Sequence, residues 1–264
     1  GRELEVALKL TAVASSSKLL FSDAGLDPLT AKSELYSRGQ PRSSDKELIE
    51  RLLEQRFSDV MVVDVTAGPL GDLHELALRA GFHVVTANKV PLSGDLASYQ
   101  RLVSARVASG STYGYETTFG AGLPVLHTLK ELVHTGDSVH SVRGCFSGTL
   151  GFLCTRLEEG AGLADAVAEA ADLGYTEPDP REDLSGRDVA RKALIIARAL
   201  GLGLEPEQVE LEALVPGLEA GLESALAAYE APLKQRLEQA RERGAEGYIK
   251  NCRYNPLRNL TLVS

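Results

Sequence analysis

Strand-like and helix-like spacings of hydrophobic residues alternate along the first part of the chain. Residues 5–14 alternate apolar and polar positions with period two, which predicts a strand. Apolar positions at helical spacing predict helices over residues 45–56 and 73–80. A continuous apolar run predicts a strand buried on both faces over residues 59–65, and residues 83–86 predict the next short strand. This alternation is typical of a doubly wound parallel sheet.

The pattern changes in the second half of the chain. Residues 136–146 alternate as a strand with two different faces would, whereas residues 163–173 and 188–200 have the periodicity of amphipathic helices. Residues 219–243 are rich in Ala, Leu and Glu and are interrupted by Pro232. This last stretch predicts a pair of solvent-facing helices.

A short segment rich in Gly, Ser and Thr, residues 109–114, separates the two patterns and suits a connection between domains. We therefore expect an α/β protein with two domains. Residues 1–112 would form an incomplete Rossmann-like doubly wound parallel sheet, and residues 113–264 a second, α+β domain for substrate binding, catalysis and dimerisation.

Charge and composition exclude several classes of function. The net charge of −9 would repel a phosphate backbone, so we expect no nucleic-acid partner. No apolar stretch approaches the roughly 18 residues of a membrane span, so we expect no membrane association. Three cysteines and five histidines at wide spacings fit neither a disulfide framework nor a zinc site, which favours a reducing, cytoplasmic compartment.

In a doubly wound sheet, ligands bind beyond the carboxyl ends of the strands. Two polar loops, residues 66–69 and 87–89, occupy such positions here, although either could be merely a turn. A dinucleotide fold normally opens with a glycine-rich turn, and no G-x-G-x-x-G occurs near the start of this chain. The strand at residues 5–14 would then be the second of the fold, and residues 15–18 (Ser-Ser-Ser-Lys) would slightly favour NADP over NAD.

Charged residues are most concentrated between Gly174 and Lys192. Asp188 and Lys192 are four residues apart and so project from one helical face, behind Ser185 as a candidate cap. Such a pair is often an ordinary surface salt bridge. A partly desolvated Lys192 could instead donate a proton to a carbonyl oxygen, while Glu177 and Asp188 could bind a substrate ammonium group.

A second segment of interest is residues 115–124. Gly120 and Gly122 permit a tight backbone bend, and a helix is expected to begin near Pro124. Such a bend can present several carbonyl oxygens to a cation. It could equally be a structural turn between domains.

These residues resemble homoserine dehydrogenase, including the form that is fused to aspartate kinase. The resemblance begins with Thr86-Ala87-Asn88-Lys89 and is most specific in the long segment from Gly174 to Lys192. The segments follow the order of the family. Those between are residues 115–124, Thr135-Gly136-Asp137 and Phe146-Ser147-Gly148-Thr149-Leu150.

The resemblance implies NAD- or NADP-linked interconversion of L-aspartate 4-semialdehyde and L-homoserine, in threonine and methionine biosynthesis, by a homodimer. It implies that Lys192 is the catalytic proton donor, with Lys89 near both the cofactor and the reacting oxygen. The other implied roles are substrate binding by Glu177, Asp188 and Gly174; cofactor binding by Thr66, Ala67, Asn88, Lys89 and Gly174; and binding of a sodium ion by backbone groups at Glu116, Phe119, Ala121 and Leu123.

The chain also departs from the family pattern. The glycine-rich opening is lacking, and several strands expected between residues 244 and 252 are lacking too, although residues 253–257 resemble the final strand. Three hypotheses follow: a working homoserine dehydrogenase, a non-catalytic truncated remnant that binds cofactor poorly, or a dehydrogenase for a different amino semialdehyde. The segment from Gly174 to Lys192 speaks against the third.

Overall fold

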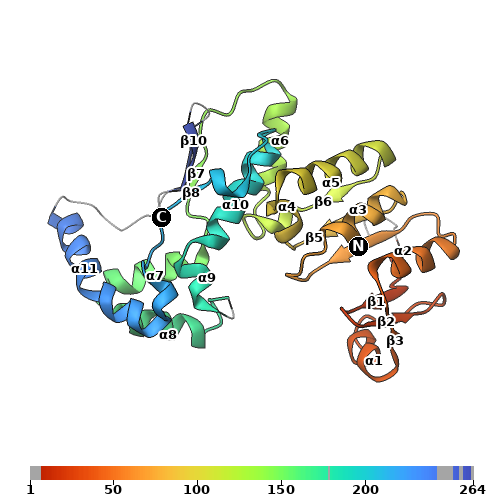
Figure 1. Ribbon diagram of the computed structural model, residues 1–264, viewed down its shortest axis with the longest axis horizontal. Coiled ribbons are helices and arrows are strands. Elements are labelled where there is room, and N and C mark those ends of the chain that lie inside the picture. Colours follow the sequence, from red (N-terminus) through yellow and green to blue (C-terminus); the bar gives the residue numbers. More distant parts are fainter. Residues whose placement is uncertain (1–6, 178, 243–251, 256–257, 263–264) are drawn as a thin grey trace. The chain divides into compact units, whose positions relative to one another are not determined.

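The computed structural model describes residues 7–177, 179–242, 252–255 and 258–262 (Figure 1). The chain divides into two compact units, which are described separately. Unit one contains residues 1–63, 70–85 and 101–113, and unit two contains residues 64–69, 86–100 and 114–264. The loops that follow the two predicted buried strands therefore belong to unit two.

Unit one begins with a small antiparallel sheet of order β1-β2-β3. Val13 pairs with Leu20, and the Ser15 hydroxyl accepts a hydrogen bond from the Lys18 amide at 3.1 Å, so the three serines form a hairpin turn. The prediction that residues 5–14 form the second strand of the parallel sheet is therefore wrong, and residues 1–6 lie outside the described part. The elements are β1 (Ala12–Ala14), β2 (Lys18–Phe21), α1 (Ala31–Arg38) and β3 (Gln40–Pro41).

A separate sheet of order β4-β5-β6 is parallel. The His83 amide donates to the Val60 carbonyl at 2.8 Å, and four residues later the Ala87 amide donates to the Asp64 carbonyl at 2.9 Å. Residue numbers increase in the same direction along β4 and β5, which is the parallel pattern expected from the sequence. The elements of this part are α2 (Asp45–Glu54), β4 (Met61–Asp64), α3 (Gly71–Arg79), β5 (His83–Thr86), α4 (Val90–Ser93), α5 (Leu96–Ser109) and β6 (Tyr113–Gly114).

The helices predicted over residues 45–56 and 73–80 are confirmed as α2 and α3. Helix α2 begins after Ser44, whose hydroxyl accepts a hydrogen bond from the Glu47 amide at 3.2 Å. The expectation that strand 59–65 is buried on both faces is wrong. Met61 and Val63 point to the same side of β4 and are 51% and 60% exposed, so that face is open among the described residues.

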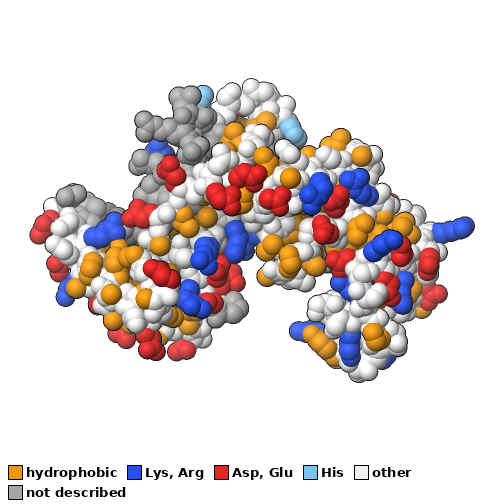
Figure 2. Space-filling view, viewed as in Figure 1, with side chains coloured by type: hydrophobic (Ala, Val, Ile, Leu, Met, Phe, Trp, Pro, Cys, Tyr) orange, Lys and Arg blue, Asp and Glu red, His pale blue; other side chains and the backbone are white. Residues whose placement is uncertain are grey.

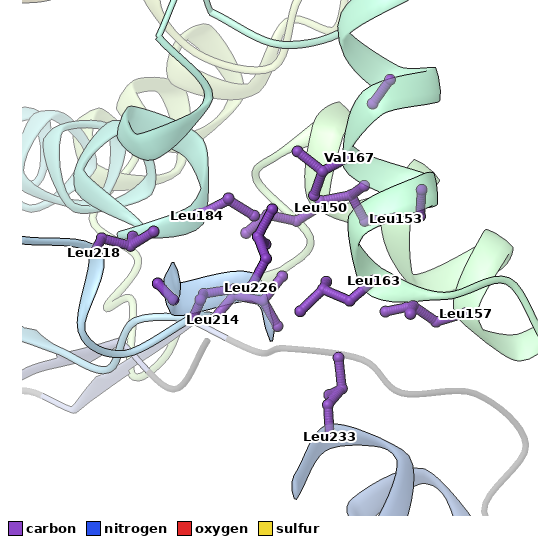
Figure 3. Close-up of a cluster of buried hydrophobic side chains, with 14 of the residues drawn as sticks. Leu150, Leu153, Leu157, Leu163, Val167, Leu184, Leu214, Leu218, Leu226 and Leu233 are labelled. Atoms are coloured by element: carbon purple, nitrogen blue, oxygen red, sulfur yellow. The ribbon is translucent and has the colours of Figure 1, made fainter. Parts of the chain in front are cut away.

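Unit two is built around helices, and a hydrophobic cluster lies between α7, α8 and α11 (Figure 3). Leu153 and Leu163 are fully buried in it, and each such side chain contributes about 1.5–3 kcal/mol by leaving water. The helices predicted over residues 163–173 and 188–200 are confirmed. The helices of this unit are α6 (Val125–His134), α7 (Gly148–Glu158), α8 (Leu163–Asp172), α9 (Pro180–Leu184), α10 (Arg187–Ala199) and α11 (Leu222–Glu242).

Helix α11 is continuous and contains Pro232, so the expected pair of solvent-facing helices is wrong, and Arg243 lies outside the described part. Leu226 and Leu233 are seven residues apart, so they share one face of the helix, and both are buried in the cluster. Packing of this apolar face holds the helix together through the proline, despite the hydrogen bond that proline cannot donate.

A four-stranded sheet of order β7-β9-β10-β8 completes unit two. The strand predicted over residues 136–146 is reduced to two residues, β7. The final strand expected at residues 253–257 is present as β9. Residues 256–257 lie outside the described residues, and so does the segment 243–251, where strands were expected to be lacking. The strands are β7 (Arg143–Gly144), β8 (Glu210–Leu211), β9 (Cys252–Asn255) and β10 (Arg258–Leu262), and short 3-10 turns occupy Glu116–Thr118, Pro206–Gln208 and Leu218–Ala220.

Acidic and basic side chains are interspersed on the face of the molecule shown in Figure 2, so this face carries mixed charge. Among the described residues, no helix is both long enough and apolar enough to cross a membrane.

Candidate active site

Asn88 ties together the two loops that follow β4 and β5. Its Nδ2 donates to Oδ2 of Asp64 at 2.9 Å and to the Gly68 carbonyl at 2.8 Å, while its Oδ1 accepts from the Val90 amide at 3.0 Å. These bonds occupy both amide hydrogens. The side chain of Asn88 thus sets the shape of the loops, whereas Thr66 and Ala67 are exposed on the first of them.

Asp64 is the buried acceptor at the centre of this loop network. Only 4% of the residue is exposed, and its Oδ1 accepts the amide of Thr66 at 2.8 Å. Sequence reasoning did not select Asp64. The available signal was a carboxylate at the end of an otherwise apolar strand, a position where a charge must be satisfied by specific donors.

Asp188 lies between two lysines. Its Oδ1 is 3.2 Å from Nζ of Lys89, and its Oδ2 is 2.6 Å from Nζ of Lys192. The three side chains are 9%, 25% and 18% exposed in the order Asp188, Lys89, Lys192, so the cluster is mostly shielded from water. Burial alone would raise the pKa of Asp188, but the two neighbouring ammonium groups, Lys192 foremost, hold this pKa below its ordinary value.

Helix α10 explains how Asp188 and Lys192 meet. The helix begins after Gly186, whose φ of +75° suits glycine, and Asp188 lies in its first turn, where a negative charge is favourable. Lys192 is one turn further along the same face. The prediction that Ser185 caps α10 is wrong, because Gly186 occupies the cap position. Ser185 instead ends α9, and its hydroxyl donates to the Glu182 carbonyl at 3.2 Å.

Lys192 has a second partner that sequence reasoning missed. Its Nζ donates to the backbone carbonyl of Phe146 at 2.7 Å. The Phe146 ring also packs edge-on against Phe119, with centroids 4.8 Å apart. A backbone acceptor leaves no mark on the side-chain pattern, so only the tertiary structure could identify it.

The charged segment of residues 174–187, the acidic loop, contributes a buried carboxylate, Asp183, which is 5% exposed. Its Oδ2 accepts the Glu177 amide at 2.9 Å. Burial raises the pKa of Asp183, and the charges of Asp188 and Glu177 add to the effect, against hydrogen bonds from the Glu177 amide and Thr149. Glu177 itself is exposed, and Asp183 fixes the backbone that carries its carboxylate.

Not every charge in this loop belongs to the cluster. Asp179 caps α9 and forms an exposed pair with Arg181 at 2.7 Å, and Glu182 pairs with Arg187 and Arg191. Pro180 starts the short helix α9, a position that tolerates proline well. Pro178 lies outside the described residues.

Gly174 ends helix α8 in an exposed, left-handed conformation with φ of +72°. Its amide donates to the Ala171 carbonyl at 3.0 Å. A side chain at this position would be strained by the backbone rather than by neighbours, because a Cβ would meet open space.

The bend at residues 115–124 is present and is stabilised by Glu116. The two carboxylate oxygens of Glu116 accept the amides of Leu126 and His127, each at 2.9 Å, and so cap the start of α6. Gly120 and Ala121 have φ of +76° and +52°, which produces the tight turn. The carbonyls of Glu116 and Leu123 already accept the amides of Phe119 and Val125, and each retains a second lone pair.

Comparison with known proteins decides the family. A model for the NAD-binding domain of homoserine dehydrogenase matches residues 2–116, and a homoserine dehydrogenase model matches residues 124–250. The chain belongs to the homoserine dehydrogenase family. It thus belongs to a family of oxidoreductases of amino-acid biosynthesis that carry an NAD-binding domain.

Part of a plant protein is similar in sequence. The chain is 42% identical over 215 residues to bifunctional aspartokinase/homoserine dehydrogenase 1, chloroplastic, of Zea mays. This alignment covers 81% of the chain and 23% of the maize protein, so the chain spans about a quarter of that relative's length.

Solved structures agree on the fold. A Candida auris protein described as of unknown function superposes with a TM-score of 0.86 at 29% identity, covering 98% of this chain and 76% of that one. A putative homoserine dehydrogenase from Archaeoglobus fulgidus gives a TM-score of 0.74 at 27% identity, covering 97% of this chain and 72% of that one. The expected class, a Rossmann-like domain with a second α+β catalytic domain, is confirmed.

Proposed function

We propose that the chain catalyses the NAD(P)-dependent interconversion of L-aspartate 4-semialdehyde and L-homoserine, a step towards threonine and methionine. The observation that carries this proposal is the placement of Asp188 between Lys89 and Lys192, at 3.2 and 2.6 Å. Two ammonium groups held by one shielded carboxylate can donate a proton to a carbonyl oxygen and stabilise the negative charge that develops on it during the reaction. The remnant hypothesis gains no support from a cluster in which these residues are already in contact.

The proton transfer is assigned to Lys192. In the direction of reduction, Nζ of Lys192 gives a proton to the aldehyde oxygen as its carbon becomes an alcohol carbon, and in the direction of oxidation it takes that proton back. The bound nicotinamide supplies or accepts the hydride at carbon. Asp188 and the Phe146 carbonyl hold Nζ in place at 2.6 and 2.7 Å, and Lys89 adds a second positive charge beside the oxygen.

The substrate ammonium group is assigned to the acidic loop. Glu177 is exposed, so its carboxylate is available to a cation entering from solvent, and the buried Asp183 holds the Glu177 backbone through the amide hydrogen bond. The resemblance also implied Asp188 for this role. Asp188 already contacts Lys89 and Lys192, and we therefore assign it to holding these two lysines in place. Gly174 would contribute a backbone contact.

The chemistry of the loops fits a dinucleotide. Thr66 and Ala67 are exposed on a loop fixed by Asn88, and Lys89 follows directly on the next loop. We assign cofactor contacts to Thr66, Ala67, Lys89 and Gly174, with Asn88 acting through the shape of the loops. Residues 1–112 remain our proposal for the NAD(P)-binding domain and residues 113–264 for the substrate-binding and catalytic domain.

The backbone bend fits a sodium ion, which we assign to the carbonyls of Glu116, Phe119, Ala121 and Leu123. The left-handed φ angles of Gly120 and Ala121 support the assignment, because a tight bend can present several backbone carbonyls to one cation. Replacing sodium by tetramethylammonium at constant ionic strength should lower turnover. Equal rates in both salts would remove the ion from the proposal.

We further propose a homodimer formed through the sheet of order β7-β9-β10-β8, since a sheet edge or face can continue into a second copy. Sedimentation velocity measures the species directly. A monomer at micromolar concentration would contradict this assignment without affecting the chemistry.

Turnover tests the central proposal. The purified protein is mixed with L-homoserine and either NAD or NADP, and the nicotinamide absorbance is followed. We expect saturable turnover that falls by about 10²–10⁴-fold in Lys192→Met. Lys234→Met removes an exposed lysine from α11 as a matched control and should leave the rate unchanged. Absence of oxidation with both cofactors, or an active Lys192→Met variant, would refute the assignment.

A further inference from the structure

Arg198 is a buried cation that the proposed chemistry does not use. The residue is 3% exposed and lies in the last turn of α10, the helix that carries Asp188 and Lys192 at its other end. Burial lowers the pKa of the guanidinium, which is the direction expected when a cation leaves water. A buried charge of this kind is costly unless its donors are satisfied.

The guanidinium is satisfied by backbone carbonyls from two segments of unit two. Nη1 donates to Leu92 at 2.7 Å, and Nη2 donates to Gly94 and to Leu204, both at 2.8 Å. The Tyr99 ring lies against it, 4.9 Å from centroid to Cζ. The planar fork of arginine suits this divergent set of acceptors, and a lysine ammonium would not reproduce it.

One of these acceptors, Leu92, belongs to the helical turn that Lys89 begins, and another, Gly94, ends that turn. Helix α4 is a single turn, in which the amides of Leu92 and Ser93 donate to the Lys89 carbonyl at 3.1 and 3.0 Å. The Ser93 hydroxyl donates to the same carbonyl at 2.9 Å. Leu92 is thus bonded both to Arg198 through its carbonyl and to Lys89 through its amide, so its position links the two residues.

We propose that Arg198 is a positioning residue, which fastens α4 to the end of α10 and thereby holds Lys89 against Asp188. This inference rests on the proposed function, because it concerns the geometry of that site. Helix α10 and the α4 turn are joined at two places: by Lys89 and Asp188 at one end, and by Arg198 with the Leu92 and Gly94 carbonyls at the other. With both joints present, Lys89 is confined to one position relative to Lys192.

A double-mutant cycle separates positioning from general stabilisation. Arg198→Lys should lower kcat/KM by about ten- to hundredfold, the usual effect of displacing a reacting group by an ångström. In a Lys89→Met background the same substitution should change kcat/KM by less than about twofold, because the residue through which it acts is gone. Equal factors in both backgrounds would overturn the proposal.

Matched variants control for folding. Arg156→Lys changes an arginine of the same unit that pairs with Glu159 and Glu169, away from α4, and should leave kcat/KM unchanged. If Arg198→Lys fails to fold, Tyr99→Leu loosens the guanidinium without removing it. Tyr99→Leu should lower kcat/KM less than Arg198→Lys, and again only when Lys89 is present.

Amide hydrogen exchange tests the joint without relying on turnover. Exchange at Leu92 and Ser93 should be at least several times faster in Arg198→Lys, or in Tyr99→Leu, than in wild type and Arg156→Lys. Unchanged exchange at these amides would overturn the proposal even if activity falls. If wild type shows no turnover, the proposed function fails, and faster exchange would still establish that Arg198 fastens α4 to α10.

Discussion

Oδ2 of Asp188 lies 2.6 Å from Nζ of Lys192, one helical turn along α10, and its other carboxylate oxygen lies 3.2 Å from Nζ of Lys89. One carboxylate thus contacts two ammonium groups that come from distant parts of the sequence. A pair at this spacing on an exposed helix contributes little to stability. Here the Asp188 carboxylate is shielded from water. Lys89 and the Phe146 carbonyl are further partners, and they fix the positions of the Asp188 and Lys192 side chains.

Replacement of Asp188 by Asn should affect both activity and stability. We expect kcat/KM to fall by at least about a hundredfold, because both lysines lose the group that places them. The free energy of unfolding at pH 7 should fall by about 1–3 kcal/mol, the usual loss for a shielded group left without its charged partner. Steady-state kinetics and urea denaturation measure the two effects.

The loss of stability in Asp188→Asn should depend on pH. Because the folded-state pKa of Asp188 is lowered, its stabilising contribution is present above the unfolded-state pKa and is lost as pH falls through the folded-state value. The difference between the two proteins should therefore close in acid. Asp165→Asn, which lies in the first turn of α8 and is exposed, is the control, and an equal loss there would show that the helix dipole alone is responsible.

Replacement of Asp183 by Asn should have the opposite pH dependence. The folded-state pKa of Asp183 is raised, so the wild type loses stability as pH rises through that value. Removing the charge should make Asp183→Asn more stable than wild type at pH 7–8 and not at pH 4, while the KM for homoserine rises. Thermal unfolding across this range measures the gap, with the exposed Asp172→Asn as control; a gap that does not grow with pH would contradict the assignment.

Replacement of Asn88 by Ala should disturb the cofactor loops. Asp64 and the Gly68 carbonyl each lose a donor, which should cost about 1–3 kcal/mol of stability. We expect the KM for the nicotinamide cofactor to rise several-fold more than the KM for homoserine. Gln100→Ala, at an exposed position of α5, should change neither value. Equal changes in both KM values would argue against a role confined to these loops.

Replacement of Glu116 by Ala should separate the helix cap from the cation site. Loss of the cap on α6 should cost about 0.5–2 kcal/mol, the range found for N-terminal caps. The response of turnover to sodium should persist, because the proposed ligand at this residue is its backbone carbonyl. Glu131→Ala, exposed near the other end of α6, is the control for stability. Loss of the sodium response at unchanged stability would instead indicate a side-chain ligand.

Periodicity in the sequence determined much of the local structure. The helices α2, α3, α8 and α10 follow from apolar residues at helical spacing, because each needs one buried face whatever its neighbours are. The same local logic placed Asp188 and Lys192 on one side of α10. It failed at residues 5–14, where alternation predicts a strand equally for a hairpin and for a parallel sheet.

Tertiary structure alone decided which charges act together. Lys89 reaches Asp188 across roughly a hundred residues, Lys192 ends on a backbone carbonyl at Phe146, and Arg198 binds carbonyls of Leu92 and Gly94. None of these contacts follows from spacing, because backbone acceptors carry no side-chain signal and long-range partners depend on how whole helices pack. The sequence determined the residue types and the faces on which they stand; packing determined their partners, because burial makes each charge depend on the groups that surround it.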